Sequence, residues 1–232
     1  MQYENAVRAQ FLRRPNRFVA QVLLEGREET VHVKNTGRCR ELLLPGSEVV
    51  LCGSGNPARK TKYDLVSVFK EGLGWVNIDS MAPNRVVEEW LAEEPPLFRP
   101  VTLLKPEQVF DDSRIDFYLE CGERRCFLEV KGCTLERDGV GYFPDAPTER
   151  GVKHLQELVR AAEAGFESYI AFVAAMPKVT RVLPNRETHP AFADALENAV
   201  AAGVKILYLP CEVSPDSLTV CGCSLCETVP LR

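Results

Sequence analysis

The alternation of apolar and polar residues between positions 113 and 131 predicts two β-strands joined by a turn. Apolar side chains occupy every second position in 115–119 and again in 126–130, and Gly122 lies between the two runs. Successive side chains of a strand point to opposite faces, so Glu129 and Lys131 must project from the same face. A hairpin can bring Asp116 to that face as well.

Before residue 80, short apolar runs separated by turn-forming residues predict a small all-β unit. The expected strands are 18–24, 30–33, 48–52, 63–69 and 74–78, and the segment 35–46 has room for a short helix. Five such strands fit a small barrel of the oligonucleotide-binding (OB) type. They fit a generic small barrel without a ligand as well, and composition does not separate the two.

After residue 80 the pattern changes to helices that alternate with apolar strands. We expect one helix over 85–93, with Asn84 as its N-cap, and another that Thr148 caps and Gly165 ends. The other expected elements are strands at 99–103, 168–174 and 204–209, a strand pair within 134–143, and a helix at 191–202. This order predicts an α/β (α+β) domain with a mixed sheet, and therefore two domains, 1–80 and 81–232.

The composition is that of an ordinary globular protein. The 232 residues are 45% hydrophobic and 26% charged, and they contain no apolar run near the roughly 20 residues that a membrane span needs. The first residues lack the basic-then-apolar layout of a signal peptide. We therefore expect a cytoplasmic protein without a membrane partner. The sequence does not decide whether the protein forms an oligomer.

The nine cysteines are expected to be thiols, because their number is odd and no secretion signal accompanies them. Cys221, Cys223 and Cys226, with Cys211 upstream, could bind Zn²⁺ through thiolates. Their spacing departs from the paired CxxC layout of a structural zinc site. A C-terminal strand with buried or reactive thiols is therefore preferred to a zinc site.

The charge distribution also separates the two parts of the chain. Residues 1–80 carry 12 Lys and Arg against 9 Asp and Glu, whereas the remainder carries 16 against 24, for a net charge of −5. The first part holds three basic patches mixed with Asn, Thr and Gly, at 13–17, 35–40 and 56–63. Their candidate phosphate-binding residues are Arg14, Arg17, Asn35, Arg38, Arg40, Arg59, Lys60 and Lys62. Solvated loops of ordinary charge are the alternative interpretation.

The spacing D-x12-E-x-K from Asp116 through Glu129 to Lys131 suggests a site for a divalent cation and a phosphate. Carboxylates supply the hard oxygen ligands that Mg²⁺ prefers, and a lysine can steady the attacking water or the developing charge. The spacing alone is weak support, because charged residues alternate on the solvent face of many antiparallel strands.

Six longer stretches carry a family resemblance. In order they are RPNRF (14–18), NTGRCRELLLPG (35–46), NPARKTKYDL (56–65), SRIDF (113–117), LEVKGCTL (128–135) and FPDAPTERGVKHLQEL (143–158). With these motifs the chain resembles the sugar fermentation stimulation protein A family over nearly its whole length. The resemblance implies an OB-like domain, a PD-(D/E)XK nuclease-like domain, DNA binding without strong sequence preference, and a regulatory link to sugar (maltose) metabolism.

The nuclease pattern, carried over by this resemblance, assigns Asp116, Glu129 and Lys131 as catalytic residues, with Mg²⁺ or Mn²⁺ on the two carboxylates. Ile115 stands where the pattern usually has a proline. Relatives often add a glutamate from the preceding helix. Glu89 is our candidate metal ligand, with Glu88 and Glu107 as alternatives.

Arg150 and His154 are four residues apart on the helix after the hairpin and so lie on one face, where both could meet the same phosphate. Three hypotheses follow. The first is a DNA-binding protein with a working Mg²⁺-dependent nuclease site, acting on single- or double-stranded DNA. The second is a non-catalytic DNA-binding regulator that uses the nuclease fold as a scaffold. The third is a phosphate-recognising enzyme with a small or RNA substrate.

Overall fold

The computed structural model of the protein describes residues 1–35, 37–55, 58–226 and 228–229. Thr36, Asn56 and Pro57, which belong to two of the basic patches, lie outside the described residues. Among the described residues, no helix has both the length and the apolar composition that a membrane crossing needs. All nine cysteines are free thiols, as expected.

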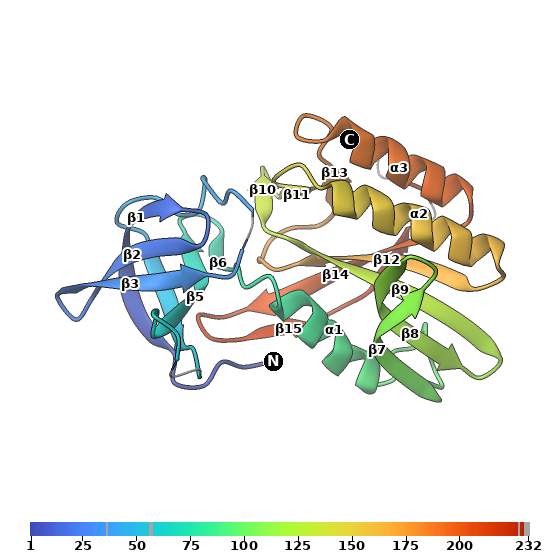
Figure 1. The fold of residues 1–232 in the computed structure, drawn as a ribbon, viewed down its shortest axis with the longest axis horizontal. Helices are drawn as coiled ribbons and strands as arrows, with labels where there is room; N and C mark the ends of the chain where they lie inside the picture. Colours follow the sequence, from blue (N-terminus) through green and yellow to red (C-terminus); the bar gives the residue numbers. More distant parts are fainter. Residues whose placement is uncertain (36, 56–57, 227, 230–232) are drawn as a thin grey trace.

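The first part of the chain is a closed β-barrel with one extra strand (Figure 1). Its strands are β1 (Val7–Asn16), β2 (Val19–Leu24), β3 (Arg27–Val33), β4 (Glu48–Gly53), β5 (Tyr63–Lys70) and β6 (Gly74–Asn77). The sheet order is β3-β2-β1-β4-β5-β6, and β3 also pairs in parallel with β5, which closes the barrel. Five strands joined in this way have the OB topology, so the predicted OB-like barrel is confirmed.

The strand β1 was missing from the sequence prediction, which expected a basic loop at 13–17. In its first half Ala9 and Phe11 point into the core, but from residue 12 onward no apolar alternation continues. The strand persists there because it pairs with β2 across two register irregularities. The helix expected within 35–46 is also wrong, since the described part of that segment forms only turns.

The second part of the chain contains a mixed sheet of seven strands. Six of them follow the order β15-β14-β12-β9-β8-β7, and β16 pairs with β14. The strands are β7 (Leu103–Phe110), β8 (Ser113–Cys121), β9 (Arg124–Cys133), β12 (Glu167–Ala174), β14 (Lys205–Val213), β15 (Leu218–Val220) and β16 (Ser224–Cys226). A smaller sheet contains β10 (Leu135–Arg137), β11 (Val140–Phe143) and β13 (Val182–Pro184). The parallel pairings of β12 with β9 and β14 confirm the predicted mixed sheet.

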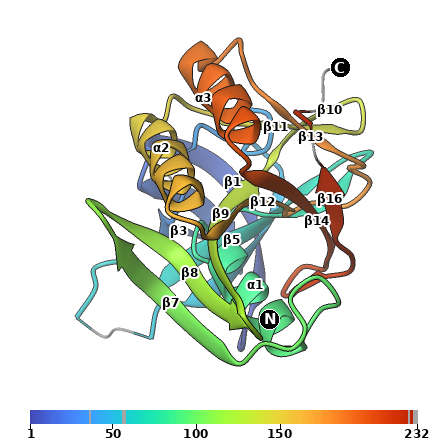
Figure 2. The same cartoon turned by 90° about the vertical axis from the view of Figure 1, so that its right-hand side faces the viewer.

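Helices cover both faces of the larger sheet (Figure 2). One face carries α2 (Glu149–Glu163) and α3 (Pro190–Ala201), and the other carries α1 (Ala82–Ala92). The expected cap Thr148 is confirmed, because its side chain accepts a hydrogen bond from the Gly151 amide over 3.0 Å. Two expectations are wrong. Met81, not Asn84, precedes α1, and the strand expected at 99–103 is instead β7.

The barrel and the second part share one continuous apolar core, which contains Phe11 and Val68 as well as Phe127 and Phe172. Hydrogen bonds also cross between them, among them the Asn77 amide to the Ala175 carbonyl over 2.9 Å. The division at residue 80 therefore stays a prediction from the sequence, because packing alone does not separate the two parts.

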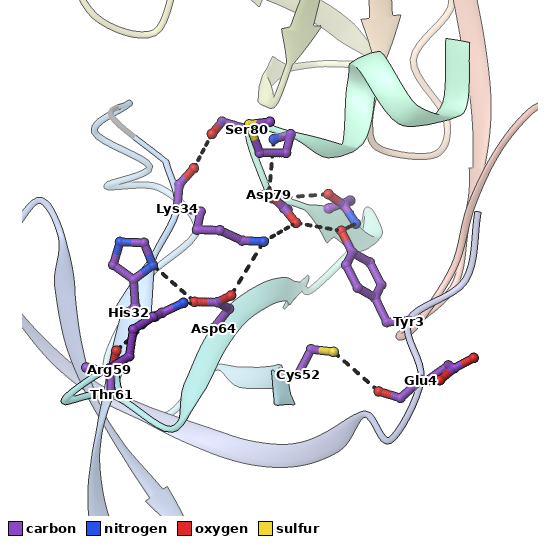
Figure 3. A network of polar contacts seen from close by, with 12 residues as sticks. Tyr3, Glu4, His32, Lys34, Cys52, Arg59, Thr61, Asp64, Asp79 and Ser80 are labelled. Atoms are coloured by element: carbon purple, nitrogen blue, oxygen red, sulfur yellow. Dashed lines mark hydrogen bonds and ion pairs between the residues drawn. The ribbon is translucent and has the colours of Figure 1, made fainter. Parts of the chain in front are cut away.

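A network of charges around the buried Asp64 and Asp79 carboxylates holds the chain where it leaves the barrel (Figure 3). Lys34 lies 2.9 Å from the Asp79 carboxylate, which is fully buried, and 3.5 Å from Asp64. Asp64 also bonds to His32 over 3.0 Å and to Arg59 over 2.8 Å. Burial alone would raise the pKa of Asp64, but these cationic and polar partners outweigh it and the pKa lies below its ordinary value.

Candidate metal and phosphate site

The hairpin of β8 and β9 brings the three predicted residues together. Lys131 Nζ donates to Oε1 of Glu129, which confirms that these side chains share a face. Asp116 lies across the hairpin, where its Oδ2 accepts from the Val130 amide over 2.8 Å. The site is therefore built on two paired strands of the larger sheet, which hold its carboxylates in place.

The helix α1 supplies an amide to this site. Asn84 Nδ2 donates to Oδ1 of Asp116 over 2.8 Å, so both oxygens of that carboxylate have a donor. The close approach depends on Gly132, because a Cβ there would lie 2.6 Å from Cγ of Pro83. The sequence pattern predicts Asn84 as a cap and gives no sign of this role in the site. The preceding Pro83 is the signal that the helix starts earlier.

The helix α2 supplies two polar side chains, Arg150 and His154, that are hydrogen-bonded in series to Glu129. Arg150 Nε donates to Nε2 of His154 over 3.1 Å. Since a guanidinium can only donate, Nε2 is the unprotonated nitrogen, and Nδ1 carries the hydrogen that His154 donates to Oε1 of Glu129. His154 therefore contacts the carboxylate, whereas the sequence prediction placed it on a phosphate. Arg150 is exposed and keeps further donors for a phosphate.

The two carboxylates have opposite electrostatic surroundings. Burial and the neighbouring Glu129 raise the pKa of Asp116 above its ordinary value, against the opposing effect of Lys131. Burial would also raise the pKa of Glu129, but Lys131 and His154 outweigh it and lower that pKa. Glu129 is therefore the member whose surroundings favour the ionised form, and Asp116 is the one that a nearby cation would favour in its charged form.

The carboxylate oxygen Oε2 of Glu129 is the feature that fits a cation. Both donors of Glu129 are on Oε1, whereas Oε2 is buried without a hydrogen-bond partner, in a residue only 1% exposed. An unpartnered buried carboxylate oxygen beside a second carboxylate suits a hard divalent ion. Among the described residues, however, no three His, Cys, Asp or Glu side chains converge as a metal cluster, neither here nor at the C-terminal cysteines.

The glutamates considered as a third ligand are placed elsewhere. Glu89 pairs with the Met1 amino group over 2.5 Å, and Glu107 pairs with Arg114 over 2.5 Å. Glu88 is exposed on α1. The helix thus contributes the Asn84 amide to the site instead of a carboxylate.

The basic residues of the barrel fall into two groups. Arg14 and Arg59 are used internally: the Arg14 guanidinium donates to four backbone carbonyls, including those of Asn35 and Arg17, and Arg59 binds Asp64. Asn35 donates to the Ile78 carbonyl over 2.9 Å. The second group is exposed and forms no ion pair or side-chain hydrogen bond with the described part of the chain; it comprises Arg17, Arg38, Arg40, Lys60 and Lys62.

Comparison with known proteins accounts for both parts of the chain. The family model described as "SfsA N-terminal OB domain" matches residues 12–78, and that described as "Sugar fermentation stimulation protein RE domain" matches residues 81–217. The chain belongs to the SfsA family. Its fold is the predicted combination of an N-terminal OB-like barrel and a second part built on a mixed sheet.

Relatives in the SfsA family are similar over almost the full chain. A "Sugar fermentation stimulation protein homolog" of Desulfitobacterium hafniense (strain DSM 10664 / DCB-2) is 54% identical over 218 residues, which cover 94% of each chain. The homologue of Ruminiclostridium cellulolyticum is 50% identical over 220 residues, covering 95% of this chain and 96% of its own. The solved structure described as "The structure of Pyrococcus Furiosus SfsA in complex with Ca2+" matches with a TM-score of 0.87 and 30% identity over 96% of both chains.

Proposed function

We propose that the protein binds DNA without strong sequence preference and cleaves phosphodiester bonds at the site formed by Asp116, Glu129 and Lys131, with Mg²⁺ or Mn²⁺ as cofactor. The observation that carries this proposal is the buried Oε2 of Glu129, which lacks a hydrogen-bond donor and lies beside a second carboxylate. The Ca²⁺ bound to the Pyrococcus furiosus relative supports a divalent cation in this family, since Ca²⁺ and Mg²⁺ both take oxygen ligands.

The residues of the chain have distinct parts in this proposal. Asp116 and Oε2 of Glu129 would hold the cation, which when bound polarises a phosphoryl oxygen and acidifies water. Asn84 fixes Asp116, and His154 fixes Glu129 so that Oε1 stays occupied and Oε2 faces the ligand. Lys131 offers its remaining donors to water or phosphate, and Arg150 offers a guanidinium fork to the neighbouring phosphate.

The barrel would supply the affinity for the nucleic-acid backbone. Its exposed Arg17, Arg38, Arg40, Lys60 and Lys62 are the side chains left for phosphates, and such contacts make binding steeply dependent on salt. DNA binding through these basic residues is compatible with the net charge of −5, because the nucleic acid would contact only this part of the surface.

One observation favours a second candidate function, a DNA-binding regulator of sugar metabolism without catalysis. Among the described residues the site has two carboxylates, and the helix α1 contributes an amide where a third ligand was expected. A scaffold that has lost a metal ligand would look like this. Phosphodiester cleavage remains our first choice because a non-catalytic scaffold gains nothing from an unpartnered buried carboxylate oxygen.

The test is a cleavage assay on labelled single-stranded, duplex, flap and branched DNA, with Mg²⁺, Mn²⁺ or EDTA. Glu129→Gln should abolish cutting, whereas Glu123→Gln, at an exposed turn of the same hairpin, should cut like the parent protein. Mn²⁺ binding by calorimetry gives a second readout, and it should be lost only in Glu129→Gln. DNA binding without cutting under any condition would reject the nuclease and support the regulator.

A further inference from the structure

A cleft of about 410 Å³ lies between the barrel and the second part of the chain. The barrel contributes Arg17 and Gly37 to its walls, and the second part contributes Gly132 at the end of β9 and the loop before α2, with Asp145, Ala146 and Thr148. A cleft of this size falls within the range of pockets that bind a small organic group.

The cleft is lined by the end of β9 and by the start of α2, the two elements that also carry Glu129, Lys131, Arg150 and His154. Along β9, Gly132 is bonded to Lys131, and consecutive Cα atoms are about 3.8 Å apart. Along the other element, Thr148 lines the cleft and caps α2, whose first turns carry Arg150 and His154. A group in the cleft would therefore lie one residue beyond Lys131 along β9 and two residues before Arg150 along the chain.

Arg17 lies on the barrel side of the cleft, but the Asp145 carboxylate on the other side disfavours a second phosphate there and favours a hydrogen-bond donor. Oδ2 of Asp145 accepts from the Cys39 amide over 2.9 Å, which fixes the carboxylate on the barrel. Oδ1 forms no hydrogen bond within the described chain, and a carboxylate can accept several. A negative charge repels phosphate, whereas a sugar hydroxyl or a base amino group would find an acceptor here.

The rim of the cleft offers contacts for the strand that leads to it. Arg17 lines the cleft, and its guanidinium lies over the Phe18 ring at 4.8 Å from the centroid. Phe18 is 47% exposed, although it is a large apolar side chain at the turn between β1 and β2. Exposed aromatic and arginine side chains beside a basic surface are typical of proteins that bind single strands.

We propose that this cleft binds one unpaired nucleoside next to the phosphate at the catalytic site, and so gives the protein a preference for single-stranded or frayed nucleic acid. The proposal rests on the proposed function, whose substrate class it specifies. A nucleoside inside a duplex is stacked and paired, so it reaches such a cleft only after the unpairing and unstacking that a free strand does not need.

The test is fluorescence anisotropy with a single-stranded oligonucleotide, the blunt duplex of the same sequence, and that duplex with a three-nucleotide overhang. Ca²⁺ serves as the cation, with uncleavable phosphorothioate linkages. We expect at least tenfold tighter binding of the single strand and the overhang than of the blunt duplex. DNA and RNA versions distinguish the donor: tighter RNA binding assigns it to the 2′-hydroxyl, and equal binding to the base.

Two variants probe the cleft itself. Asp145→Asn keeps an acceptor for the Cys39 amide but removes the charge, and Ala146→Trp fills the cleft without a change of charge. Both should reduce the preference for the single strand at least fivefold while the duplex Kd stays within twofold, and the exposed Glu123→Gln should change neither. Equal effects on both substrates, or no preference in the parent protein, would overturn the inference while leaving the proposed function intact. Absence of binding to every oligonucleotide would reject the proposed function as well.

Discussion

The contact between α1 and β9 at Gly132 makes a quantitative prediction about both stability and the site. In Gly132→Ala the new Cβ would lie 2.6 Å from Cγ of Pro83, a ring atom that cannot rotate away. The first turn of α1 must then move off β9. Overpacking of this kind costs about 1–3 kcal/mol. Because Asn84 follows Pro83 directly, its 2.8 Å hydrogen bond to Asp116 should lengthen too.

The measurement is chemical and thermal unfolding in EDTA, followed by Mn²⁺ titration. For a chain of this size each kcal/mol lowers Tm by roughly 2–4 °C. Gly53→Ala is the matched control, because no atom lies within 4 Å of its added Cβ and no left-handed backbone is involved. We expect Gly132→Ala to unfold earlier and to bind Mn²⁺ more weakly than this control. Equal stability of the two variants would refute the argument from close packing.

Three further predictions concern charge and capping. Asp116→Asn should be more stable than the parent protein at pH 7 in EDTA, because a raised folded-state pKa means that the ionised carboxylate destabilises the fold above that pKa. The gain in stability of Asp116→Asn over the parent protein should vanish below about pH 4, near the ordinary pKa of aspartate. With Mg²⁺ the parent protein should become the more stable of the two. Thermal unfolding scans from about pH 4 to 8 measure both effects. Thr148→Ala should lose about 1 kcal/mol in urea unfolding, since the Gly151 amide loses its cap; an unchanged midpoint would contradict this role. Lys34→Met should lose roughly 2–3 kcal/mol, because it leaves the fully buried Asp79 carboxylate without its cation, whereas the exposed Lys60→Met should be neutral.

Much of the fold was predictable because local patterns and tertiary packing agree. The strand β8 alternates cleanly between buried and partly exposed residues, β9 has apolar residues at every second position from Cys126 to Val130, and Thr148 and Gly165 mark the ends of α2 with ordinary capping chemistry. The failures occur where pairing partners override the local pattern. In β1, the polar residues after Phe11 stay extended because β2 pairs with them, and no single-strand periodicity reports that.

The residues of the candidate site were predictable from the sequence, but their hydrogen-bond partners were not. Strand periodicity is sufficient to place Glu129 beside Lys131. Strand periodicity does not show that His154 binds Glu129 instead of a ligand, or that the Arg14 guanidinium donates its hydrogen bonds to backbone carbonyls. Except for the contact of Arg14 with the Arg17 carbonyl, these outcomes depend on residues more than 20 positions apart, which only the folded chain brings together.

The shared apolar core also fixes the distance between the barrel and the hairpin of β8 and β9. The barrel packs into the second part of the chain and is bonded to it, for example by Lys70 to Glu136 over 2.6 Å, and these contacts hold the two parts in one relative position. If the protein binds DNA as proposed, a strand held by the barrel would meet the hairpin of β8 and β9 at a constant distance. The length of the bound footprint would then be set by the core of the protein and not by the sequence it binds.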